Sequence, residues 1–143
     1  MKISIIFALA FAVLTSLHYF VQLSSVRLNI EKGNFEGLEH FVQANPISII
    51  TSIDMLGWIL FLGLSSFFIF PIFTGNRLNR IIRYSFIING LSCFIAGIRY
   101  IFKIDILTFI FINSGVGGAV ITMTISSIKL FRRLIHKSNV PSA

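Results

Sequence analysis

Charged residues and cysteines are scarce in this sequence. Only 12% of its 143 residues are Asp, Glu, Lys or Arg, whereas about a quarter of an ordinary soluble domain is charged. This composition excludes a typical soluble fold. The single cysteine, Cys93, excludes an intramolecular disulfide, a CxxC redox motif and a cysteine metal site. Acids are also few, five against twelve Lys and Arg, which gives a formal net charge of +7.

Apolar residues are abundant and lie in long runs. The chain is 55% hydrophobic, contains 16 Phe and has a mean hydropathy of +0.88. Four segments reach the roughly 20 residues that a helix needs to cross a bilayer; they are residues 3–26, 47–73, 81–102 and 106–128. Because backbone polar groups inside a bilayer must be satisfied within the segment, we expect helices. The first run is longer than the apolar core of a signal peptide, so we expect it to remain as a span.

The one long connection, residues 27–46, carries its own helical signal. Phe35, Leu38 and Val42 recur at helical spacing with polar residues between them. This spacing predicts a short amphipathic helix over residues 34–43 that caps the spans or lies at the membrane interface. Asn45-Pro46 is typical of a helix start, and Pro71 should kink or end the second span.

Short connections determine how the spans are arranged. Residues 74–76 form a tight turn into the third span, and only residues 103–105 join the third span to the fourth. Such short links make consecutive helices antiparallel. The sequence therefore predicts an all-α, antiparallel four-helix transmembrane bundle in a single domain, with a basic cytoplasmic tail at residues 129–143.

The charges are segregated along the chain, and this predicts the orientation. Most cations fall on one side of the predicted spans: Lys2, Arg77, Arg80, Arg83, Lys129, Arg132, Arg133 and Lys137. The other side has fewer cations and all five acids: Arg27, Lys32, Arg99 and Lys103, with Glu31, Glu36, Glu39, Asp54 and Asp105. By the positive-inside rule, both termini are cytoplasmic in a cell membrane and residues 27–46 face outward. Because the cations serve as anchors against anionic lipid, the high net charge does not indicate a nucleic-acid partner.

Polar residues occur at one depth in several predicted spans. His18, Asp54 and Asn113 lie about 10–14 Å below the predicted outer surface at 1.5 Å per residue. Thr15, His18, Gln22 and Ser25 share one helical stripe. On the third span Gly90 and Gly97, and on the fourth Ser114, Gly118, Thr122 and Ser126, would let helices approach closely.

These polar residues have two interpretations. In the structural one, they hydrogen-bond across helices, and Asp54 pairs with Arg99 or with His18. In the functional one, they line an outward-opening cavity, because intramembrane ionisable residues are usually functional. The candidate ligand-binding residues are His18, Gln22, Asp54, Trp58, Arg99 and Asn113, with Phe61 as apolar wall. No residue is assigned to a metal or a cofactor.

Three stretches carry a resemblance to known sequences. They are Tyr19–Arg27, Asn45–Trp58 (Asn-Pro-Ile-Ser-Ile followed by Asp54-Met-Leu-Gly-Trp) and Arg83–Gly90. Across its first three spans the chain resembles small bacterial integral membrane proteins with four transmembrane helices, a group that carries no assigned activity. The resemblance implies a topology and no mechanism.

The favoured hypothesis is a membrane protein that binds a small amphiphilic or apolar ligand, or a lipid, in an outer-half pocket, or that serves as an accessory subunit. Three alternatives remain open. An intramembrane enzyme could use Asp54 and His18 for acid–base chemistry on a lipid-like substrate. A transporter or channel subunit would need a homo-oligomer. A structural or immunity-type protein would need a membrane-protein partner.

Overall fold

The regular structure of the chain is helical. The computed structural model describes residues 1–103 and 110–138, and no strand occurs among them. The first long helix comprises α1 (Lys2–Val21), the π-helical η1 (Gln22–Val26) and α2 (Arg27–Glu31). The second comprises α3 (Ile49–Leu56), the π-helical η3 (Gly57–Leu62), α4 (Gly63–Ile69) and the 3-10 turn η4 (Phe70–Ile72). The third is α5 (Arg77–Ile101), and the fourth consists of the π-helical η5 (Phe111–Gly117) and α7 (Gly118–Ser138).

Three of these helices are long and apolar enough to cross a membrane: Lys2–Glu31, Ile49–Ile72 and Arg77–Ile101. Each overlaps a predicted span, which confirms the first three predictions at this level. At 1.5 Å per residue the first helix, with 30 residues, is about 45 Å long, longer than a hydrocarbon core of about 30 Å. Large apolar side chains such as Phe20 and Ile98 remain exposed along these helices, as expected of surfaces that face lipid.

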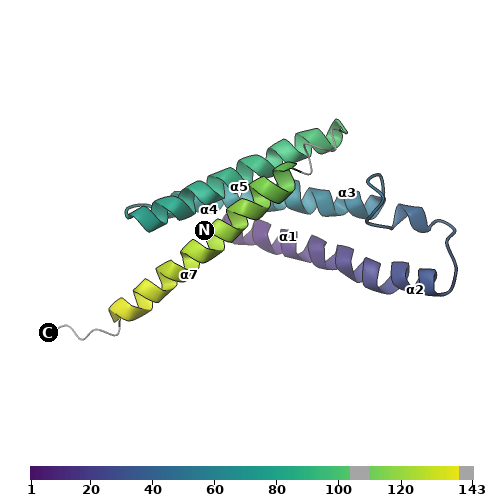
Figure 1. Cartoon of the computed structure of the whole chain (residues 1–143), viewed down its shortest axis with the longest axis horizontal. Helices are drawn as coiled ribbons and strands as arrows, with labels where there is room; N and C mark the ends of the chain where they lie inside the picture. The colour runs from purple at the N-terminus through teal and green to yellow at the C-terminus, as the bar shows by residue number, and fades with distance from the viewer. Residues whose placement is uncertain (104–109, 139–143) are drawn as a thin grey trace.

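Each long helix packs mainly on its neighbours in the sequence. α1 contacts α3, η3 and α4, whereas α5 contacts η3 and α4 as well as η5 and α7. Figure 1 shows α1 alongside α3 and α4, with α7 crossing α5 at an angle. Polar contacts accordingly occur at successive helix pairs. Ser4 on α1 bonds Ser65 on α4, and Asn89 on α5 donates to Ser66 on α4.

Glycines allow the close approach of α5 to the second helix. Gly90 and Gly97 are buried, and a Cβ atom at either would collide with Phe67 or Ile59, respectively. Both had been expected at a helix contact. On the fourth helix the close contact occurs at Gly115, which faces Ser92, whereas a Cβ at Gly118 would meet open space. The fourth helix therefore approaches α5 through a different glycine from the predicted one.

The connecting segments differ from the predictions in their details. Between residues 34 and 43 the structure has a single 3-10 turn, η2 (Leu38–His40), because Gly37 adopts the left-handed conformation with φ 72° just before it. α3 starts at Ile49, capped by the Ser48 hydroxyl, and not at Asn45-Pro46. Pro71 ends the second helix as predicted.

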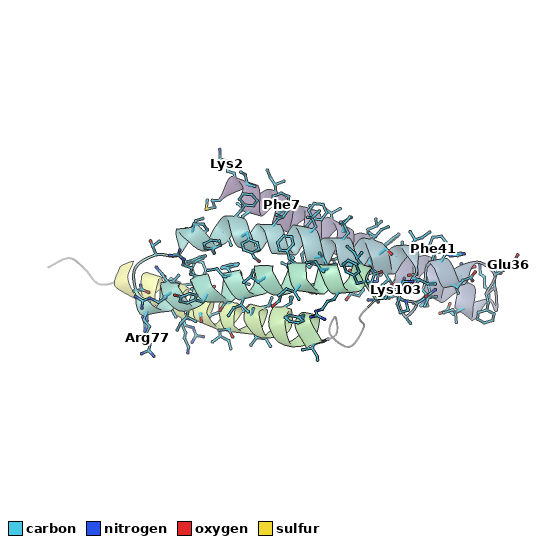
Figure 2. All side chains as sticks on the ribbon, turned by 90° about the horizontal axis from the view of Figure 1, so that it is seen from above. Lys2, Phe7, Glu36, Phe41, Arg77 and Lys103 are labelled. Carbon is cyan, nitrogen blue, oxygen red and sulfur yellow. The ribbon has the colours of Figure 1, made fainter. Side chains whose placement is uncertain are left out.

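The fourth predicted span and the tail are covered in part. Residues 106–109 and 139–143 lie outside the described residues, and so does Asp105. α7 continues through Ser138, so the first part of the predicted tail is helical. Figure 2 places Lys2 and Arg77 toward one end of the molecule, with Glu36, Phe41 and Lys103 toward the other. We call the latter end, which includes residues 32–48, the loop end.

Candidate functional site

A buried pair of ionisable side chains joins the first and second helices. His18 on α1 and Asp54 on α3 place Nδ1 and Oδ1 3.3 Å apart, and their side chains are 0% and 8% exposed. The contact is an ion pair when His18 is protonated, and no hydrogen bond joins the two side chains. Within the described part of the chain, both His18 ring nitrogens, Asp54 Oδ1 and Thr15 Oγ1 are buried without a hydrogen-bond partner. Such unsatisfied polar atoms are rare in folded proteins and require an explanation.

Local packing holds the pair in position. Gly57, one turn beyond Ile53 on the second helix, has no side chain, and the atoms opposite it belong to Phe11, Leu14 and Thr15 of α1. A Cβ atom at Gly57 would make ordinary van der Waals contacts with these atoms, so the two helices pack against each other beside the pair without requiring a glycine there. The Trp58 ring packs edge-on against Phe11 with ring centroids 5.1 Å apart, and its indole also faces the Asp54 carboxylate.

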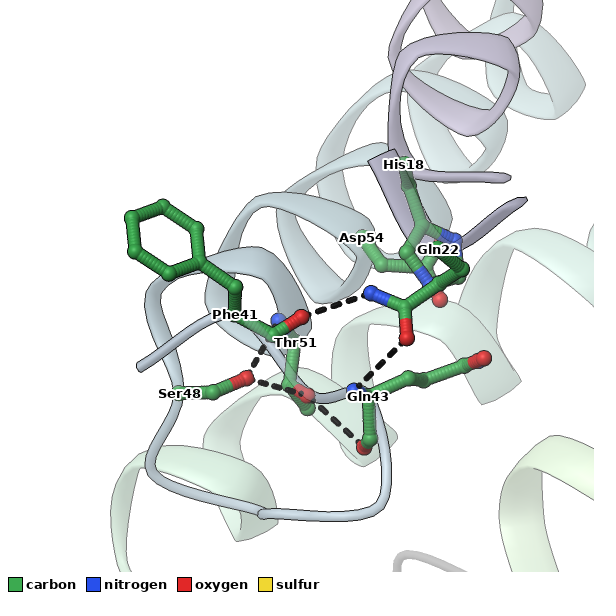
Figure 3. A network of polar contacts seen from close by, with 7 residues as sticks. All are labelled: His18, Gln22, Phe41, Gln43, Ser48, Thr51 and Asp54. Carbon is green, nitrogen blue, oxygen red and sulfur yellow. Dashed lines mark hydrogen bonds and ion pairs between the residues drawn. The ribbon is translucent and has the colours of Figure 1, made fainter. Parts of the chain in front are cut away.

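Gln22 connects the loop end to the first helix through two hydrogen bonds. Its amide nitrogen donates to the Phe41 carbonyl oxygen at 2.6 Å, and its amide oxygen accepts from the Gln43 main-chain N–H at 3.2 Å. Figure 3 shows these bonds next to His18 and Asp54. Gln22 lies one turn after His18, so the loop is held against the same stretch of helix that carries the buried pair.

The second helix holds the same loop through Thr51. Its hydroxyl donates to the Gln43 carbonyl oxygen at 2.9 Å, while the Ser48 hydroxyl donates to Thr51 Oγ1 at 2.9 Å. The main-chain N–H of Thr51 donates in turn to Ser48 Oγ at 3.1 Å. Gln43 is thus bonded through its main chain to α3 as well as to η1, as Figure 3 shows. The loop therefore bridges the two helices next to the His18–Asp54 pair.

A cavity of about 410 Å³ lies between this loop and the two helices. We call it the loop cavity. Its apolar walls are Val21, Leu38, Phe41 and Ile50. Its polar lining is Ser25, Asn29 and Glu36. Val21 follows His18 by about one turn and Ile50 precedes Asp54 by one turn, so the cavity lies next to the buried pair on both helices.

A second cavity of about 620 Å³ lies where α3 and α5 meet at the loop end. Its lining includes Asn45, Ile47, Ser52, Tyr100, Ile101 and Lys103. The Tyr100 hydroxyl donates to the Pro46 carbonyl oxygen at 2.9 Å and lies 3.3 Å from Ser52 Oγ. Tyr100 thus anchors the start of the second helix to α5.

The six predicted site residues divide into two groups. His18, Gln22, Asp54 and Trp58 lie together between the first and second helices. Arg99 lies on α5 with its guanidinium 5.7 Å from the Phe111 ring centroid. Asn113 is on η5 with an exposed side chain. Of the two partners considered for Asp54, the structure pairs it with His18.

The cavity lining contains residues that the sequence did not single out. Asn29, Glu36 and Phe41 lie in the connection of residues 27–46, where the sequence predicts no site residue. The sequence contains one signal for this cavity. Ser25 falls on the same helical stripe as His18 and Gln22, and it lines the cavity. π-helical turns contain Gln22, Trp58 and Asn113. Such turns often mark functional sites, but a sequence gives no rule for them.

Comparison with protein-family models, with curated proteins and with solved structures found no match.

Proposed function

We propose that this chain is a multi-pass membrane protein that binds an amphiphilic molecule in the loop cavity. One observation carries the proposal: the cavity has apolar walls and a polar lining, and it lies one turn from a buried His18–Asp54 pair. Its volume of about 410 Å³ is within the usual range for small-molecule sites, roughly 300–1,000 Å³. The apolar body of the ligand lies against Val21, Leu38 and Ile50, and its polar group reaches the polar lining at Ser25 and Glu36.

The proposal includes the antiparallel four-span topology expected from the sequence. Both termini face the cytoplasm, and the loop end faces outward and covers the bundle. The cations of the opposite end then lie at the cytoplasmic surface, where anionic lipid attracts them. In this orientation the loop cavity opens at the outer membrane boundary, so a ligand enters from the outer leaflet or the outer medium.

The six sequence-predicted residues keep different roles in this proposal. His18, Gln22, Asp54 and Trp58 do not line the loop cavity. His18 and Asp54 lie one turn from it on the two helices, and Gln22 holds the loop beside them. Arg99 and Asn113 belong to the α5–η5 contact, away from the loop cavity, and serve the packing of the third and fourth helices.

Native mass spectrometry of three purified forms tests the binding function. The forms are the wild type, Ser25→Phe, which fills the mouth of the cavity, and Ser16→Phe, which adds the same ring to an exposed position of α1. We expect a discrete bound mass in the wild type and in Ser16→Phe, and its loss in Ser25→Phe. Identical spectra from all three forms, with bare protein or the same mixed lipids, would refute the proposal.

A second function, acid–base chemistry on a lipid-like substrate, draws on the 3.3 Å separation of His18 and Asp54. A carboxylate beside an imidazole can move a proton to or from a reacting group. Asp54→Asn tests this function because it keeps the size of the side chain. A loss of turnover with an unchanged unfolding midpoint would favour the enzyme, whereas unchanged turnover would exclude a role for Asp54 in it.

A further inference from the structure

One acid at the loop end, Glu36, has no basic partner among the residues that the structure describes. Of the four acids in the described part of the chain, Asp54 contacts His18, Glu31 pairs with Arg27 at 3.1 Å, and Glu39 lies 3.5 Å from His40. The Glu36 carboxylate makes no such pair within these residues. Glu36 is also the acid that lines the loop cavity. An unpaired negative charge thus lies at the edge of a cavity whose walls are apolar.

The surroundings of Glu36 suit a cation. Phe41 lines the same cavity, and the face of an aromatic ring attracts ammonium groups. No Lys or Arg lines the cavity among the described residues: the Arg27 guanidinium is engaged by Glu31, and Lys32 is exposed outside the lining. Residues 27–46 carry two cations and three acids, so this segment is locally negative in a chain whose net charge is +7.

From these observations we infer that the ligand of the loop cavity is a cationic amphiphile, with an ammonium group between Glu36 and Phe41 and an apolar chain against Val21, Leu38 and Ile50. This inference rests on the proposed binding function and adds the charge of the head group to it. Asn29 does not compete for that role, because its amide nitrogen donates to the Ser25 carbonyl oxygen and its amide oxygen accepts from Asn34. The net positive charge of the whole protein repels cations. Binding of a cation in the loop cavity therefore depends on the local contacts with Glu36 and Phe41.

Three amphiphiles with the same sixteen-carbon chain test the inference. Hexadecyltrimethylammonium, hexadecanol and hexadecanoate are titrated into the protein in a neutral maltoside detergent, and bound ligand is counted by native mass spectrometry. We expect the ammonium compound to bind roughly three- to tenfold more tightly than the alcohol, as expected for one exposed ion pair with a cation–π contact. The carboxylate should bind more weakly than the alcohol.

Two acids of the same loop, Glu36 and Glu39, provide the matched comparison. Glu36→Gln should remove most of the preference for the ammonium compound over the alcohol, and Phe41→Leu should reduce it. Glu39→Gln, which changes an acid of the same loop outside the cavity lining, should keep the full preference.

The possible failures have different meanings. Equal binding of all three compounds by the wild type, or a preference that survives Glu36→Gln, would overturn the head-group assignment and leave the amphiphile site intact. Tighter binding of the carboxylate would also overturn it. If no compound bound to the wild type, the proposed function itself would fail.

Discussion

At the scale of single residues, the contribution of His18 and of Asp54 to the stability of the fold depends on the presence of the other side chain. Both side chains have lost nearly all contact with solvent, and an isolated charge in such a place is strongly unfavourable. Each residue therefore depends on the other, and removal of one leaves its partner buried and unmatched. The sequence predicted that Asp54 would be matched by His18 or by Arg99, and only the packing of α1 on α3 decides between them.

This dependence predicts non-additive stability changes. Asp54→Leu and His18→Leu should each lower the free energy of unfolding by about 1–3 kcal/mol, because each removes the 3.3 Å ion-pair contact and leaves the other ionisable group buried alone. The double variant should cost clearly less than the sum of the two single changes, because it leaves neither group behind. Reversible unfolding in mixed detergent and SDS, followed by far-ultraviolet circular dichroism, measures all three. Strictly additive losses would mean that the two side chains do not interact.

At the scale of structural elements, the loop over residues 32–48 is held by main-chain bonds to two side chains, Gln22 and Thr51. The amphipathic spacing of Phe35, Leu38 and Val42 predicted a helix here. The structure has a 3-10 turn at Leu38–His40, because Gly37 has a positive φ and the following carbonyl and N–H groups bond to Gln22. Long-range bonds of this type leave no pattern in the local sequence.

The Gln22 clamp predicts a local change in hydrogen exchange. Gln22→Leu removes the acceptor of the Gln43 N–H and the donor to Phe41, so amide exchange over residues 41–45 should become faster. Gln43→Leu is the control, because Gln43 takes part in these bonds only through its main chain. It should leave the exchange unchanged. Equal acceleration in both variants would mean that the loop responds to any substitution and not to loss of the clamp.

Helix contacts give a second prediction at this scale. Gly97 on α5 faces Ile59 so closely that no Cβ atom fits, whereas Gly118 on α7 faces open space. Gly97→Leu should therefore destabilise the protein by about 1–3 kcal/mol through overpacking. Gly118→Leu should be neutral or stabilising, because leucine favours the helix. The detergent–SDS unfolding assay compares the two, and equal losses would contradict the observed packing of α5 on the second helix.

At the scale of the whole molecule, composition and hydropathy predicted most of the fold. Long apolar runs require helices in a membrane, so the first three spans and their ends near Pro71 and Asn76 followed from simple rules. Only part of the candidate site could be predicted from the sequence. His18, Gln22, Asp54 and Trp58 were brought together as expected from shared depth and stripe. Arg99 and Asn113 were not, because the Arg99 guanidinium lies against the Phe111 ring of η5 and the Asn113 side chain is exposed.

Accessibility of engineered cysteines tests the proposed topology. The native Cys93 is 1% exposed, so it should give no background with a membrane-impermeant maleimide. Phe35→Cys, at the loop end, should react in intact cells, whereas Thr74→Cys, in the opposite turn, should react only after the membrane is permeabilised. The reverse pattern would turn the loop cavity toward the cytoplasm and contradict the orientation deduced from the positive charges.

The most direct measurement of the central claim is the position of a bound amphiphile. A sixteen-carbon ammonium compound with a diazirine near its head group is photo-crosslinked to the wild-type protein, and the adducts are mapped by peptide mass spectrometry. The proposed site predicts adducts on segments 21–29 and 36–41 that disappear when excess unlabelled compound competes. Adducts confined to lipid-facing residues such as Leu91 and Ile98, unaffected by competition, would contradict a binding site in the loop cavity.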